Sequence, residues 1–182
     1  MVLLKSLELE MGRKAPNFSL MGIDGETYTL SDFDQAKVLV IVFMCNHCPY
    51  VQAVWARLVR LQSDFDQVQF VGINPNTANP EYHEETMEKM GDYGKRYEMN
   101  FPYLEDRDQS VARVYGAVCT PDIYVYDSER KLVYHGRIDD NWQDEVAVTR
   151  EELREVLAAL VTGGDLPNLN YPSIGCSIKW VD

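Results

Sequence analysis

Residues 38–65, VLVIVFMCNHCPYVQAVWARLVRLQSDF, decide the fold. The opening run, 38–44, is continuously apolar, which predicts a β-strand covered on both faces. After Cys48 the apolar residues recur at steps of three and four, as on one face of an amphipathic helix: Val51, Val54, Leu58, Leu61 and Phe65. Two cysteines therefore stand where a buried strand passes into a helix.

The spacing of Cys45 and Cys48 has a chemical consequence at a helix start. One helical turn places both side chains on the same side, within reach of a disulfide bond. Unpaired N–H groups and the positive end of the helix dipole stabilise an anion there, which predicts a thiolate at Cys45. An imidazolium at His47 favours that thiolate, and Pro49 suits the first helical turn because it lacks an N–H.

A zinc site is the alternative reading of the paired cysteines. Zinc needs two further ligands at suitable spacing, and the remaining cysteines and histidines form no second paired element. The pattern therefore favours redox chemistry, with no metal and no cofactor.

The flanking sequence alternates between strand and helix patterns. Hairpins are predicted around Asp24-Gly25 and at 122–138, a further strand at 68–73, and helices at 81–98, 108–115 and 150–161. Thr149 and Glu152 have the spacing of a capping box before the last helix. The order predicts an α/β fold with a right-handed parallel βαβ unit, and the tail beyond residue 164 shows no periodicity.

Composition limits the partners. The formal charge of −12 disfavours nucleic acid and anionic membranes, and no stretch approaches the roughly 20 apolar residues of a membrane span. The N-terminal residues lack the apolar core of a signal peptide, so we expect a cytoplasmic protein. Four cysteines in a reducing compartment argue against a disulfide scaffold.

Four motifs together resemble one family. The strand, CxxC and helix order with a later Thr120-Pro121 resembles the thioredoxin superfamily, and APNFSL with GETYTLSDF resembles its redoxin or peroxiredoxin-like (AhpC/TSA) branch. FMCNHCPYV, CTPDIYVYD, HGRIDDN and IGCSIKW are similar to bacterial proteins described as thiol-disulfide isomerase or thioredoxin. The resemblance implies a thioredoxin-like domain at 1–164, with a central mixed sheet flanked by helices, an N-terminal β-hairpin and a C-terminal extension at 165–182 packed on it.

The resemblance also implies a thiol-disulfide oxidoreductase and assigns roles to its residues. Cys45 is the expected nucleophile and Cys48 the resolving cysteine. Pro121 is expected to be cis and to face them, with Thr120 offering its backbone to a substrate. The expected partners are protein disulfides or dithiols, with the thioredoxin or glutathione system as electron donor, and the oligomeric state stays open.

Two other functions stay open, a thiol-dependent peroxidase and a non-catalytic redox sensor. Aligning Cys48 with the cysteine of the peroxidase motif PxxxTxxC places Ile41 and Cys45 where that motif has proline and threonine, which argues against a dedicated peroxidase.

Some further residues have two interpretations. Cys119 and Cys176 are either additional redox thiols or buried packing residues. The polar run 137–141 either supplies a carboxylate that takes the proton of Cys48 or forms a solvated turn. The acidic run 81–88 is interpreted as a solvated helix face.

Overall fold

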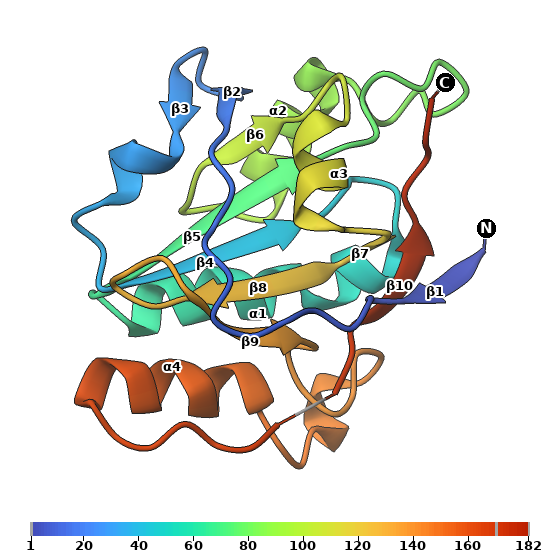
Figure 1. Ribbon diagram of the computed structural model, residues 1–182. Coiled ribbons are helices and arrows are strands. Elements are labelled where there is room, and N and C mark those ends of the chain that lie inside the picture. The colour runs from blue at the N-terminus through green and yellow to red at the C-terminus, as the bar shows by residue number, and fades with distance from the viewer. Residues whose placement is uncertain (1, 170, 182) are drawn as a thin grey trace.

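The computed structural model describes residues 2–169 and 171–181, which form two β-sheets and their covering helices (Figure 1). The larger sheet has the order β3-β2-β6-β5-β4-β8-β9. Its strands are β2 (Ser19–Gly22), β3 (Thr27–Thr29), β4 (Val38–Phe43), β5 (Val68–Asn74), β6 (Tyr103–Glu105), β8 (Asp122–Tyr126) and β9 (Leu132–Gly136). β4, β5 and β6 are parallel, whereas β8 runs antiparallel to β4. The sheet is therefore mixed, as predicted.

Helices cover both faces of this sheet. They are α1 (Pro49–Asp64), α2 (Met87–Arg96), α3 (Ser110–Tyr115) and α4 (Glu152–Thr162), with short 3-10 turns η1 (Leu30–Phe33) and η2 (Glu145–Ala147). Val38, Val40 and Val42 of β4 pack in one apolar cluster with α1 and α4. Leu39, Ile41 and Phe43 belong to the opposite cluster, with α3 and η1. Burial of alternate residues on opposite faces explains the unbroken apolar run of β4.

The smaller sheet contains the C-terminal segment that the sequence left unassigned. Its order is β1-β10-β7, formed by β1 (Leu3–Lys5), β10 (Ile174–Ser177) and β7 (Cys119–Thr120). β10 pairs antiparallel with both neighbours, and Figure 1 shows it beside the start of the chain. Segments from the two ends of the chain thus meet next to β7.

Most predicted elements are present, with two corrections. The helix predicted at 81–98 begins only at Met87, because the Thr86 side chain caps it by accepting from Lys89 N at 3.2 Å. The capping box predicted at Thr149 is wrong: α4 is capped at Glu151, and Thr149 hydrogen-bonds to Asp140 instead.

The hairpin at Asp24-Gly25 forms, with Gly25 at a φ of 85°. Within the described residues, no helix combines the length and apolarity that crossing a membrane requires.

Candidate active site at the start of α1

The cysteine motif lies in the short connection between β4 and α1. Cys48 is the N-cap residue of α1 and Pro49 is its first helical residue, which confirms the predicted helix start. Both Cys45 and Cys48 are 0% exposed. All four cysteines lie in the described part of the chain, and none is in a disulfide.

Thr120 lies against both cysteines of the motif. Its Oγ1 is 3.2 Å from Cys45 Sγ, and its carbonyl oxygen accepts from Cys48 Sγ at 3.1 Å. The Thr120-Pro121 bond is cis, as the family resemblance implies. The fold thus brings together residues separated by more than 70 positions, although their catalytic roles stay a prediction.

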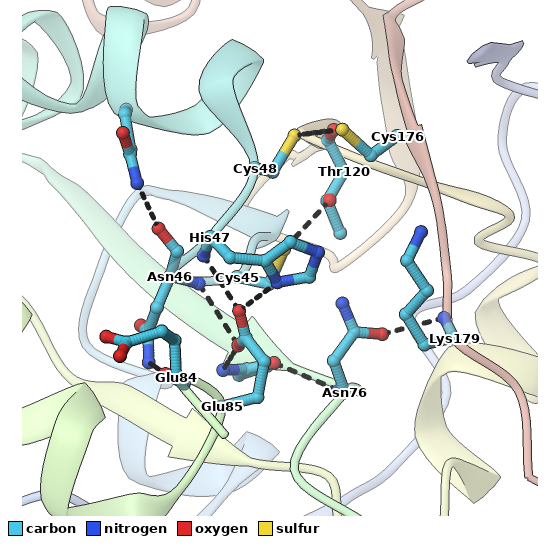
Figure 2. A network of polar contacts seen from close by, with 12 residues as sticks. Cys45, Asn46, His47, Cys48, Asn76, Glu84, Glu85, Thr120, Cys176 and Lys179 are labelled. Carbon is cyan, nitrogen blue, oxygen red and sulfur yellow. Dashed lines mark hydrogen bonds and ion pairs between the residues drawn. The ribbon is translucent and has the colours of Figure 1, made fainter. Parts of the chain in front are cut away.

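The backbone of Thr120 is not open to a substrate in this structure. It pairs with Cys176 in the β7–β10 ladder, so the chain's own C-terminal strand occupies that edge. Cys176 Sγ lies 2.8 Å from Cys48 Sγ (Figure 2). Cys119 Sγ instead lies 4.0 Å from the carbonyl oxygen of Pro121. The structure therefore joins Cys176, rather than Cys119, to the motif.

Glu85 is the site residue that the sequence did not reveal. It is 1% exposed, and its carboxylate accepts from Asn46 N at 3.1 Å, His47 N at 2.8 Å and Asn74 Nδ2 at 2.7 Å. It also pairs with His47 Nδ1, and Figure 2 shows it directly beneath the motif backbone. The interpretation of residues 81–88 as a solvated face is therefore wrong at Glu85.

Asn46, between the cysteines, is held by three further contacts. Its Nδ2 donates to Glu84 O at 2.6 Å, its Oδ1 accepts from Tyr103 Oη at 3.0 Å, and its carbonyl accepts from Gln52 Nε2 at 2.7 Å. Asn46 is fully buried. The connection between β4 and α1 is therefore fixed from both sides by hydrogen bonds.

The electrostatics favour ionisation of Cys48 over ionisation of Cys45. Burial raises the pKa of Cys45 well above its usual value, and the Cys48 and Glu85 side chains raise it further. Hydrogen bonds from Cys176 and Cys45 lower the pKa of Cys48. These directions do not favour the predicted Cys45 thiolate, and the role of Cys45 as nucleophile stays a prediction.

The other two thiols, Cys119 and Cys176, do not ionise readily. The hydrogen bond to Cys48 raises the pKa of Cys176, and burial adds to this effect. Burial raises the pKa of Cys119, and the charge of Asp122 adds to it. Among the four cysteines, Cys48 is the one whose pKa is lowered.

Cys45, His47 and Glu85 have ligand atoms that all lie within 4.8 Å of one another. Each Glu85 oxygen, however, already accepts two N–H donors, from Asn46 and Asn74 or from His47. A metal ion would have to displace these donors and release the motif backbone. The arrangement therefore fits a hydrogen-bonded carboxylate better than a metal ligand.

The side chains of the polar run 137–141 bond to residues other than the cysteines. Asp139 Oδ2 accepts from Arg57 Nη1 at 2.5 Å, Asp140 accepts from Thr149, and Arg137 pairs with Glu152. These contacts tie the run to α1 and α4. They support a structural role over the proton-accepting one.

Comparisons with known proteins agree with this geometry. Residues 11–135, more than half of the chain, match the AhpC/TSA family. A structure from Geobacillus kaustophilus, described as an uncharacterized conserved protein, is 42% identical with a TM-score of 0.94, over 100% of this chain and 97% of that one. Thioredoxin-domain structures superpose at lower identity, for example 19% with a TM-score of 0.62, which shows the shared fold.

Two relatives differ in the chemistry that their names describe. Thiol-disulfide oxidoreductase ResA of Bacillus thuringiensis is 21% identical over 155 residues, covering 84% of this chain and 80% of the relative. Peroxiredoxin Bcp of Escherichia coli is 28% identical over 111 residues, covering 59% and 65%. The chain is thus similar to redox proteins of both kinds.

Proposed function

The chain belongs to the AhpC/TSA family, and on that premise we propose that it is a thiol-disulfide oxidoreductase acting through Cys45 and Cys48. The observation that carries this proposal is the placement of Cys48 at the N-cap of α1, hydrogen-bonded by neighbouring thiols that lower its pKa. A thiolate is the reactive form in disulfide exchange. The similarity to an oxidoreductase, ResA, points the same way.

The proposed reaction proceeds in two exchanges. Cys48 loses its proton, and the resulting thiolate attacks a substrate disulfide, forms a mixed disulfide and releases the first substrate thiolate, which takes up a proton. Cys45 then loses its proton and attacks Cys48 Sγ, forming the Cys45–Cys48 disulfide and releasing the second substrate sulfur as a thiol. The substrate gains two electrons and two protons, and the cysteine pair loses them.

The neighbouring residues have positioning roles in this proposal. Thr120 holds both sulfurs through its hydroxyl and carbonyl oxygens, next to Pro121. Glu85 and His47 fix the backbone between the cysteines. Glu85 also disfavours charge on Cys45, because its carboxylate raises the pKa of that thiol.

The proposal extends to the partners and the location of the protein. We propose protein disulfides or dithiols as substrates, the thioredoxin or glutathione system as electron donor, and a cytoplasmic location. The charge of −12 disfavours nucleic acid and anionic membranes. We treat residues 1–164 as one thioredoxin-like domain with residues 165–182 as its extension.

Insulin reduction with dithiothreitol as donor tests the activity. The protein should accelerate it catalytically, and Cys48→Ser should reduce the rate by at least about 10³-fold because both exchanges involve this sulfur. Cys119→Ser is the matched control and should keep the rate. Stoichiometric oxidation without turnover would contradict the proposal and support a non-catalytic redox sensor.

Peroxide reduction is a second candidate, favoured by one observation. The cysteine with the lowered pKa is Cys48, which aligns with the reactive cysteine of the peroxidase motif, and the chain is similar to peroxiredoxin Bcp. Ile41 and Cys45 replace the proline and threonine of that motif. Consumption of hydrogen peroxide with dithiothreitol, lost in Cys48→Ser, would support this candidate, and faster turnover with peroxide than with insulin would favour it over disulfide exchange.

A further inference from the structure

The C-terminal strand brings a third sulfur to the motif. Cys176 lies 128 positions after Cys48 in the chain, yet their Sγ atoms are 2.8 Å apart. Both residues are buried, and Figure 2 shows the two sulfurs facing each other beside Thr120. Hydrogen bonds from both Cys45 and Cys176 lower the pKa of Cys48.

Backbone pairing, rather than a chance side-chain approach, sets this contact. Cys176 is directly opposite Thr120 in the ladder and opposite Leu3 in the other pairing of β10. A Cβ atom at Gly175 would lie 1.9 Å from the Thr120 carbonyl oxygen, so the close approach of β10 depends on glycine at this position.

The segment after Cys176 is anchored as well. Ile178 N donates to Val118 O at 3.0 Å, and Lys179 N donates to Asn76 Oδ1 at 2.9 Å. The pairing of β10 and the hydrogen bonds after it therefore hold the Cys176 sulfur at Cys48.

We propose that Cys176 is a third redox-active cysteine, which displaces Cys45 from its disulfide with Cys48. This inference rests on the proposed function, which forms the Cys45–Cys48 disulfide. Cys176 then loses its proton and attacks Cys48 Sγ, so that the Cys48–Cys176 bond forms and the Cys45–Cys48 bond breaks. Cys45 receives the electron pair and the proton, and the exchange needs no further oxidant.

The exchange changes which parts of the fold are linked. A Cys45–Cys48 disulfide lies within the connection between β4 and α1, whereas a Cys48–Cys176 disulfide joins the start of α1 to β10. The oxidised bond thereby moves to the C-terminal strand, and Cys45 returns to a thiol beside Thr120 and Glu85. A reductant of the Cys48–Cys176 disulfide has to react at Cys176 or Cys48.

Disulfide mapping of the full-length protein tests this exchange. The protein is equilibrated with reduced and oxidised glutathione, quenched with acid, alkylated and analysed by peptide mass spectrometry. Cys45→Ser should contain a Cys48–Cys176 disulfide in most molecules, and the unsubstituted protein should contain both disulfides. Cys119→Ser should match the unsubstituted protein. An alkylated Cys176 with glutathione on Cys48 in Cys45→Ser would overturn the inference.

A second variant keeps all the thiols and moves only the strand. Gly175→Ala should force β10 away from Thr120 and lower the yield of the Cys48–Cys176 disulfide at least about tenfold. Gly91→Ala is the control, because no atom lies within 4 Å of a Cβ there. An undiminished yield in Gly175→Ala would overturn the inference. Insulin turnover with no Cys48–Cys176 disulfide would overturn this inference and leave the proposed function intact. Absent turnover would overturn the proposed function.

Discussion

Two buried carboxylate–imidazole pairs lie in this fold, Glu85–His47 at the motif and Asp122–His135 between β8 and β9. Asp122 Oδ1 is 2.8 Å from His135 Nε2, and its Oδ2 accepts from Tyr124 Oη at 3.0 Å. Both carboxylates have fully buried side chains, and each lies near a cysteine: the charge of Glu85 raises the pKa of Cys45, and that of Asp122 raises the pKa of Cys119. The residue types are the same, but their connections differ.

The difference lies in what each carboxylate holds. Glu85 accepts from two backbone N–H groups between the cysteines, so it positions the segment that carries them. Asp122 instead joins side chains of two adjacent strands. The His47 side chain is 17% exposed and that of His135 only 3%. One pair organises a reactive connection, and the other stabilises the sheet.

Glu85→Gln should show the largest effect of this comparison. Glutamine offers one acceptor oxygen in place of two, and its amide N–H₂ would face N–H donors that the carboxylate now satisfies. We expect a loss of about 2–3 kcal/mol in the free energy of unfolding and a fall in the pKa of Cys45. Urea denaturation and a thiolate absorbance titration measure these two effects.

Glu84→Gln is the matched control for that variant. Glu84 is exposed and contributes its backbone carbonyl to Asn46, which the substitution preserves. Equal stability and equal thiolate titrations for the two variants would contradict the role assigned to Glu85.

Asp122→Asn should affect stability without affecting the chemistry. The buried His135 and Tyr124 would lose a charged acceptor, at a cost of about 1–3 kcal/mol in the free energy of unfolding. The insulin reduction rate per folded molecule should not change, because Asp122 contacts neither Cys45 nor Cys48 through its side-chain hydrogen bonds. A loss of the insulin reduction rate per folded molecule in Asp122→Asn would contradict the distinction between the two pairs.

The contrast also shows which parts of the structure could be predicted from the sequence. β4, α1 and the cysteine pair were predicted because their signals are local: an apolar run, a helical period and a fixed spacing. Thr120 and Pro121 came from the family resemblance, and the cis bond confirms that part of it.

The remaining site residues were hidden because their contacts are distant in the chain. Glu85 stands in an acidic run that matches a solvated helix, and only the late start of α2 at Met87 sets it apart. The tail was unassigned because β10 has few residues and gains its hydrogen bonds from β1 and β7, which are far away in sequence. Local periodicity contains no information about either contact.

The pH dependence of stability should separate the thiols of the two regions. The pKa of Cys48 in the fold is below the unfolded value of about 8.5, so its contribution to stability is full above that value and is lost as the pH falls. The stability difference between the unsubstituted protein and Cys48→Ser should therefore grow from pH 5 to pH 8. Urea denaturation at both values measures it.

Cys119→Ser provides the opposite expectation in the same experiment. The pKa of Cys119 is raised by burial, so its contribution is full below the unfolded value and is lost only as the pH rises past it. Its stability difference should stay flat between pH 5 and pH 8. A flat difference for Cys48→Ser as well would mean that Cys48 is not ionised in the fold.

His47→Asn should have the smallest effect, although the sequence assigns His47 a direct influence on the thiolate. The backbone N–H of residue 47 would still donate to Glu85, and only the ring contact would be lost. Because the imidazole contacts the Glu85 carboxylate, we expect its loss to shift the reduction potential by less than about 30 mV. A glutathione redox titration measures this shift. The potential of the unsubstituted protein should lie above thioredoxin's value of about −270 mV, since the thiol donors around Cys48 stabilise the reduced form. A larger drop in His47→Asn would show that the ring acts on the sulfurs directly, and that Glu85 serves to hold the ring in place.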